Sequence, residues 1–245
     1  MAMAERGHKL WEPSSETIDR SAISTYMRWL AAERGVETGD YHELWRWSVD
    51  DLDGFWRSIW DHFGVRSERD PGPALAEDRM PGARWFPGAR LNWAEHCLRL
   101  DGRSDDDIVV IARSQARERI ALTAAQLRDE VARVRGGLLR LGVRRGDRVA
   151  AYLPNVPEAA IGLLATASIG AIWSSCAPEF GTRSVVDRWS QIEPSVLLTI
   201  DGYRYGTRAV DRSAEVAAIR SALPSLRHTV VLPYLDSEQI GRAHV

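Results

Sequence analysis

Apolar positions recur in two different rhythms along this chain. In the first hundred residues they follow helical spacing, with three or four residues between successive members. The first such helix carries its apolar side chains at Ile23, Tyr26, Met27 and Leu30. It is expected to follow the capping candidates at residues 14–17 and to end at Gly35. The chain therefore begins with a helical region.

A second helix has the clearest amphipathic pattern. Its apolar side chains recur at i, i+3, i+4, i+7, i+8 and i+11, and they are Leu52, Phe55, Trp56, Ile59, Trp60 and Phe63. Residues 48–51 resemble a capping box with Asp in place of Glu, and Gly64 follows the pattern. Full burial of these side chains would contribute on the order of 10 kcal/mol before entropy is counted. We interpret the stripe as a packing face rather than an aromatic ligand cage.

Beyond a polar break at residues 101–107, short apolar runs alternate with helical patterns. The expected strands are residues 108–112, 119–122, 148–153, 171–174, 196–200 and 229–232. The expected helices are residues 127–141, 158–169, 182–192 and 212–223, the first after a capping-box pattern at 123–126. Strands separated by helices predict a parallel sheet with right-handed crossovers. The predicted fold class is α/β, an incomplete parallel-sheet (αβα) subdomain preceded by a helical N-terminal cap.

The composition argues against two kinds of function, nucleic-acid binding and a Walker-type phosphate loop. The chain has 245 residues and a net charge of −2, and no basic face or run stands out, so nucleic acid is not an expected partner. Lys9 is the only lysine among 32 cationic residues. It lacks the glycine-rich context of a Walker-type phosphate loop, which excludes that motif.

The two cysteines predict a reducing compartment, and the N-terminus bears on whether the protein is secreted. Cys97 and Cys176 form no Cys-x-x-Cys pair, so we expect neither a disulfide framework nor a zinc site, and a cytoplasmic location. Residues 1–13 mix charges and have no apolar segment typical of a signal peptide. Residues 159–178 carry no charge, but their Gly, Ser and Thr content favours a buried helix and strand. No membrane partner is expected.

The side chains that could carry chemistry do not gather in the sequence. The histidines at 42, 62, 96 and 228 show no metal-binding spacing, so no metal ligand is assigned. Cys176 follows a predicted strand, where a nucleophile could lie. No basic neighbour in the sequence would lower its pKa, so we interpret it as a small buried residue.

Several segments resemble the adenylate-forming acyl-CoA synthetases. The matching begins at residues 85–95 and continues through 142–158, whose Gly-Asp-Arg-Val turn and Leu-Pro-Asn end are typical of the whole superfamily. Three further segments are specific to a smaller part of the superfamily. They resemble the acetoacetate–CoA ligase branch and comprise residues 173–181, 187–194 and 201–206. Acetyl-CoA synthetases carry a glycine-rich segment where Ala177 to Glu179 stand here.

The resemblance covers residues 41–235 and implies a domain organisation. Residues 1–100 correspond to the helical N-terminal region of acyl-CoA synthetases, and residues 101–236 to the N-terminal part of the AMP-binding domain. Residues 237–245 form an atypical tail without a family counterpart. The phosphate loop, the acyl pocket and the C-terminal domain of the family have no match. The chain is therefore expected to be an N-terminal fragment that is inactive alone, and no catalytic residue is assigned.

The family reaction implies the cofactors of the intact enzyme. Acetoacetate, ATP and Mg²⁺ would give an acyl-adenylate, and CoA would then displace AMP. The resemblance places the nucleotide end of CoA on Ala177, Pro178 and Glu179 and on Arg204 and Arg208. Arginine suits this role because its guanidinium binds phosphate through two parallel hydrogen bonds. No cofactor is assigned to the fragment by itself.

Two other functions remain open. One is a module that binds CoA or a nucleotide without catalysis. The other is a ligase for another short-chain acid, of the acetyl or propionyl type. The resemblance also leaves residues 229–232 as an unpaired apolar strand edge, which favours aggregation.

Overall fold

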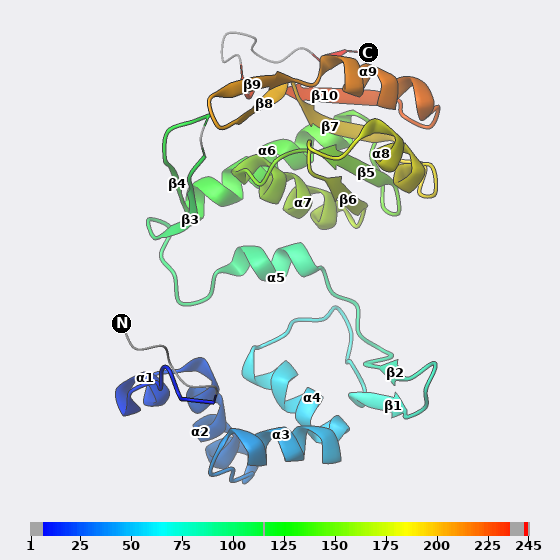
Figure 1. The fold of residues 1–245 in the computed structure, drawn as a ribbon. Coiled ribbons are helices and arrows are strands. Elements are labelled where there is room, and N and C mark those ends of the chain that lie inside the picture. Colours follow the sequence, from blue (N-terminus) through cyan, green and yellow to red (C-terminus); the bar gives the residue numbers. More distant parts are fainter. Residues whose placement is uncertain (1–6, 115, 236–242, 245) are drawn as a thin grey trace. The chain divides into compact units, whose positions relative to one another are not determined.

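The computed structural model describes residues 7–114, 116–235 and 243–244 (Figure 1). The chain forms two compact units, Met1–Leu91 and Asn92–Val245. The domain division inferred from the sequence, at residue 100, stays a prediction.

The first unit is mainly helical. Its elements are α1 (Ser15–Asp19), α2 (Ala22–Arg34), α3 (Tyr41–Asp50), α4 (Leu52–His62), β1 (Leu75–Glu77) and β2 (Arg84–Trp85). A small core of Tyr26, Leu30 and Leu44 joins α2 to α3 and α4. Gly35 ends α2 with φ 64°, a left-handed conformation that glycine adopts without strain, which confirms the predicted stop.

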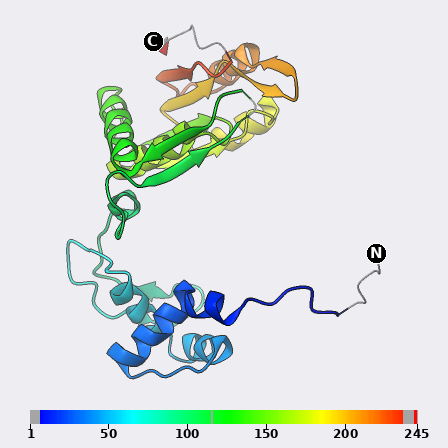
Figure 2. The ribbon, with the colours of Figure 1, turned by 90° about the vertical axis from the view of Figure 1, so that its left-hand side faces the viewer.

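The segment before α1 extends away from the helices of this unit (Figure 2). It carries Lys9, whose exposed ammonium lies 3.0 Å from the carboxylate of Glu12. An exposed ion pair of this kind contributes little to stability.

The predicted start of the amphipathic helix was wrong. Ser48 lies inside α3, where its hydroxyl donates to the carbonyl of Trp45 at 2.7 Å. Asp51 is the N-cap of α4, and its carboxylate accepts from the amide of Gly54 at 2.9 Å. The two helices adjoin, because one aspartate can both end the first and cap the second.

The apolar stripe of α4 is only half-buried within the described residues. Trp56 and Phe63 keep 42% and 62% of their surface exposed, so the full burial expected from the sequence is not realised. The stripe nevertheless packs aromatic rings. Trp60 stacks on Phe86 with 4.6 Å between ring centroids, and Trp56 meets Trp85 edge-on at 6.0 Å.

The second unit contains the predicted sheet. Its elements are α5 (Trp93–Arg99), β3 (Ile108–Ala112), β4 (Ile120–Thr123), α6 (Ala124–Arg140), β5 (Arg148–Tyr152), α7 (Pro157–Ile169), β6 (Ile172–Cys176), α8 (Thr182–Trp189), β7 (Val196–Ile200), β8 (Gly202–Tyr205), β9 (Arg208–Asp211), α9 (Ser213–Ala222), β10 (His228–Leu232) and β11 (Ala243–His244). The main sheet has the order β11-β10-β7-β5-β6, and neighbours among β10, β7, β5 and β6 are parallel. This confirms the α/β class.

Helices cover both faces of this sheet (Figure 1). Val149 and Ala151 of β5 pack with α6 and α7, whereas Ala150 and Tyr152 pack with α8 and α9. The alternation follows from the pleat, which sends successive side chains to opposite faces. The chain passes from β5 to β6 on one side and then to β7 on the other. The topological switch point therefore lies between β5 and β7.

The two expected runs at 108–112 and 119–122 form β3 and β4, an antiparallel pair separate from the parallel sheet. One sequence expectation needs correction. The edge of β10 is paired in part, because β11 runs antiparallel to it at Thr229 and Val230. Unpaired backbone groups of an edge strand accept any extended segment that reaches them. Most of the predicted atypical tail, residues 237–242 and 245, lies outside the described residues.

Candidate functional site

The carboxyl edge of the parallel strands forms the candidate site, because ligands of open α/β sheets bind there. The loop after β6 leads into α8, and β7 leads into a hairpin made of β8 and β9. The chain segment after β10 lies at the same edge. Every site residue predicted from the sequence lies on the loop or on the hairpin.

The loop after β6 is a tight turn that the hydroxyl of Tyr152 contacts. The amide of Phe180 donates to the carbonyl of Ala177 at 3.1 Å. Pro178 is buried, Ala177 is half-buried and Glu179 is exposed. The hydroxyl of Tyr152, at the end of β5, lies 2.7 Å from the carbonyl oxygen of Pro178 and 2.6 Å from that of Phe180. The three predicted loop residues therefore share one turn.

The hairpin separates the two predicted arginines. Arg204 lies opposite Ala209, and Arg208 lies opposite Tyr205. Directly opposed residues share a face and successive residues alternate, so Arg204 and Arg208 project from opposite faces of the hairpin. Both are exposed. The structure therefore does not bring them together around one group.

A third arginine, missed by the sequence reasoning, joins the hairpin to α9. Arg212 is the N-cap of α9 and only 15% of its side chain is exposed. One nitrogen donates to the carboxylate of Glu215 at 2.6 Å and another to the hydroxyl of Tyr203 at 3.1 Å. Its guanidinium also lies 5.2 Å from the centre of the Tyr203 ring. No sequence motif distinguished this arginine from its many neighbours.

Several of these groups act electrostatically on the hydroxyl of Tyr152. Burial raises the pKa of Tyr152, the charge of Arg212 lowers it, and Glu215, Tyr203 and Glu179 raise it. The net direction is upward, so the phenol keeps its proton at neutral pH and acts as a donor. Loop, hairpin and the start of α9 thus share one polar cluster.

A second polar cluster lies around Arg117 and the residues that follow β10. Arg117 pairs with Glu158 of α7, donates to the carbonyl of Pro233 at 3.1 Å and lies 4.6 Å above the ring of Tyr234. Asp201 accepts from the amide of Tyr234 at 2.8 Å. A pocket beside Arg117 and Asn155 has a volume of about 10 Å³, which is too small for a nucleotide.

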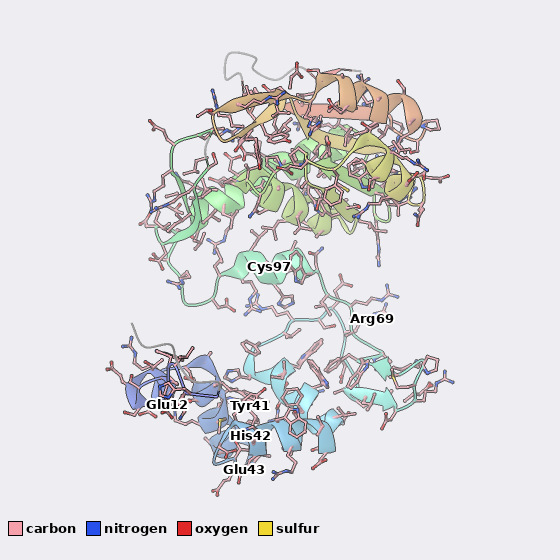
Figure 3. The ribbon with its side chains drawn as sticks, in the orientation of Figure 1. Glu12, Tyr41, His42, Glu43, Arg69 and Cys97 are labelled. Carbon is pink, nitrogen blue, oxygen red and sulfur yellow. The ribbon has the colours of Figure 1, made fainter. Side chains whose placement is uncertain are left out.

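The histidines and cysteines do not form a metal site in the described part of the chain, where no group of three His, Cys, Asp or Glu side chains could hold an ion. His62 packs edge-on against Tyr26 and Trp29, with ring centroids at 5.1 and 4.9 Å. Cys97 lies on α5 and His42 near the start of α3 (Figure 3). The two cysteines are free thiols.

Cys176 has a basic neighbour after all, which corrects the sequence expectation. Burial raises the pKa of this thiol, while the charge of Arg188 and a hydrogen bond from it lower the pKa. The net shift is upward. The interpretation of Cys176 as a buried residue is confirmed, since only 6% of its surface is exposed.

We expect native Cys176 to react with iodoacetamide at pH 8 at least about tenfold more slowly than in the unfolded chain, because the thiolate is the nucleophile and burial raises the pKa. The raised pKa means that this group's stabilising contribution is present below the unfolded-state pKa and is lost as pH rises through the folded-state pKa. Mass spectrometry of the alkylated peptide, in native buffer and in concentrated urea, measures the two rates. Equal rates would contradict the prediction.

No helix among residues 7–114 and 116–235 is long and apolar enough to cross a membrane. Two sequence profiles match the chain. One, described as AMP-binding enzyme, matches residues 99–243. The other, described as acetyl-coenzyme A synthetase N-terminus, matches residues 41–97.

Curated relatives match over most of this chain. The acetoacetyl-coenzyme A synthetase of Rhizobium meliloti (strain 1021) is 40% identical over 92% of this chain and 34% of its own length. The acetoacetyl-CoA synthetase of Macaca fascicularis is 34% identical over 94% of this chain and 34% of its own length. A malonamoyl-CoA synthetase of Penicillium aethiopicum is 36% identical over 91% and 31%, respectively. The chain thus spans about a third of the length of these relatives.

A solved structure matches the fold. The acetoacetyl-CoA synthetase from Streptomyces lividans superimposes with a TM-score of 0.88 at 46% identity. The match covers 93% of this chain and 35% of that chain. This likeness confirms the α/β fold predicted from the sequence.

Proposed function

Because this chain belongs to the AMP-binding enzyme family, we propose that it forms the N-terminal portion of an acid–thiol ligase. The ligase would make acetoacetyl-CoA from acetoacetate, ATP and CoA through an acyl-adenylate. The observation that carries the proposal is the likeness to the Streptomyces lividans enzyme, at 46% identity over 93% of this chain. In this proposal residues 1–100 form the helical N-terminal region and residues 101–236 the first part of the AMP-binding domain.

The contribution of the described residues would be a wall that faces CoA. The loop with Ala177, Pro178 and Glu179 would approach its nucleotide end, and Arg204 or Arg208 would bind phosphate. A charge-assisted hydrogen bond of this kind contributes roughly 1.5–3 kcal/mol. Because the two arginines project from opposite faces of the hairpin, each would have to meet a different phosphate group. CoA offers such separated groups in its 3′-phosphate and its pyrophosphate.

ATP and Mg²⁺ are assigned to no residue here. Among the described residues no group of three His, Cys, Asp or Glu side chains could bind a metal ion. Carboxylate and phosphate oxygens are the ligands that Mg²⁺ prefers. No catalytic residue is proposed in this chain. A cytoplasmic location stays a prediction.

A ligase for a different acid is the second candidate. The Penicillium aethiopicum relative is named for malonamoyl-CoA, yet it matches 91% of this chain at 36% identity. Similarity over this region therefore does not separate one acyl group from another. The non-catalytic CoA-binding module differs in its prediction, since the isolated chain would then bind CoA with micromolar affinity.

A graft tests the proposal. Residues 7–235 replace the matching segment of the Streptomyces lividans acetoacetyl-CoA synthetase, and AMP release is measured with acetoacetate, ATP and CoA. We expect the graft to keep acetoacetate-dependent activity within about tenfold of the parent enzyme. A soluble graft with native circular dichroism but no such activity would contradict the proposal.

A matched graft that carries the Penicillium aethiopicum segment addresses the acyl group. If both grafts prefer acetoacetate, the choice of acid lies outside this segment.

The isolated chain, given acetoacetate, ATP and magnesium, should release no pyrophosphate. Pyrophosphate release by the isolated chain would show that the activating machinery lies within it.

A further inference from the structure

The buried end of β5 carries a hydroxyl that reaches two backbone carbonyls at once. Tyr152 has no exposed surface and lies on the face of the sheet that α8 and α9 cover. Its hydroxyl is 2.7 Å from the carbonyl oxygen of Pro178 and 2.6 Å from that of Phe180. A phenol has one proton to donate, so the two carbonyls share it.

These contacts determine the shape of the loop after β6. Both carbonyl oxygens face this hydroxyl, and without a donor the buried carbonyl of Pro178 would be left unpaired away from water. The ring of Phe180 is held separately, because the guanidinium of Arg188 on α8 lies 4.9 Å from its centre. The loop is therefore fixed through its backbone by Tyr152 and through one side chain by Arg188.

The same hydroxyl also feels the charge of the residue that supports the hairpin. The charges of Arg212, Glu215 and Glu179 all act on Tyr152. Arg212 in turn binds the hydroxyl of Tyr203 on β8 at 3.1 Å. Tyr152 thus binds the loop of the proposed CoA wall directly, and it interacts electrostatically with the arginine that supports the hairpin.

We propose that Tyr152 is a positioning residue for CoA, whose hydroxyl holds residues 177–180 in the conformation that receives the nucleotide end of CoA. This inference rests on the proposed function for its ligand. It does not rest on that function for the loop conformation, which can be measured without CoA. If Tyr152 acted only by filling space, Tyr152→Phe would leave the loop conformation unchanged, because phenylalanine fills the same space.

The test uses Tyr152→Phe in the full chain for loop exchange and in the Streptomyces lividans graft for CoA affinity. We expect backbone amides of residues 179–182 to exchange with deuterium about tenfold faster in the variant, while amides of β7 stay protected. In the Streptomyces lividans graft that carries residues 7–235, Tyr152→Phe should raise the dissociation constant for CoA about tenfold, which calorimetric titration measures. Circular dichroism should be unchanged.

Two further variants separate positioning from packing. Tyr234→Phe removes a hydroxyl from the same sheet edge and keeps the ring that lies under Arg117 at 4.6 Å, so loop exchange should stay at the wild-type rate. Replacement of Tyr152 by 4-aminophenylalanine restores a donor of similar reach. It should return both loop protection and CoA affinity towards wild type.

The outcomes distinguish this inference from the proposed function. A graft that keeps Tyr152 and does not bind CoA counts against the proposed CoA wall. Loop exchange that Tyr152→Phe leaves unchanged overturns the inference, whichever way the CoA titration falls. Faster loop exchange together with unchanged CoA affinity also overturns it, because the loop conformation would then not matter for the ligand.

Discussion

Replacing Trp189 with alanine should lower the free energy of unfolding by about 3–5 kcal/mol. Trp189 has no exposed surface and packs between α8 and the sheet with Val185 and Leu197. Its indole nitrogen donates to the hydroxyl of Ser174 at 3.1 Å. The substitution removes both the largest fully buried side chain and this donor. Urea unfolding followed by circular dichroism measures the change.

Trp93→Ala is the matched control, since Trp93 belongs to the same unit and 55% of its surface is exposed. We expect this variant to lose less than about 1 kcal/mol. Equal losses for the two variants would mean that the core around α8 does not carry the stability that its burial implies.

Replacing Gly202 with valine should cost about 3 kcal/mol and separate the first pair of the hairpin. A Cβ at this position would lie 2.3 Å from the carbonyl oxygen of Val210 and 2.5 Å from a methyl carbon of Leu235. The carbonyl belongs to the backbone, so β8 and β9 must move apart. Amides of residues 203–210 should then exchange freely, which hydrogen–deuterium exchange detects.

Gly136→Ala provides a contrast of opposite sign. Gly136 lies inside α6, and a Cβ there would meet the nearest guanidinium nitrogen of Arg140 at 3.5 Å, an ordinary contact. Alanine should raise the free energy of unfolding by about 0.5–1 kcal/mol, because it restricts the unfolded chain more than glycine does. A destabilised Gly136→Ala variant would contradict the view that the close contact at Gly202, and not the loss of a glycine as such, causes the destabilisation there.

The parallel sheet could be predicted because its signals are local. The fully buried strand β7 is a continuous apolar run, and such runs between helical patterns are typical of parallel sheets. The capping box at Thr123 and Gln126 formed as expected, and it marks the start of α6. These features depend on residues a few positions apart, so one sequence is enough to find them.

The hairpin is also local, whereas the contacts of Tyr152 with the loop after β6 join residues far apart in the sequence. Alternation of Tyr203, Tyr205 and Val210 around a glycine could have indicated β8 and β9, but those residues were interpreted as part of a family motif. The role of Tyr152 had no such signal. Its acceptors lie 26 and 28 positions further along the chain, and only the packing of β5 beside β6 brings them together.

Because Lys9 is the single lysine of the sequence, amine chemistry can be directed to very few positions. Its ammonium is exposed on the segment before α1, and all other cationic side chains except the histidines are arginines. Reagents that acylate amines would attach a fluorophore or a surface tether there or at the α-amino group. Labelling would leave the guanidinium groups of Arg204, Arg208 and Arg212 unmodified, so ligand binding at the sheet edge could be followed by single-molecule methods.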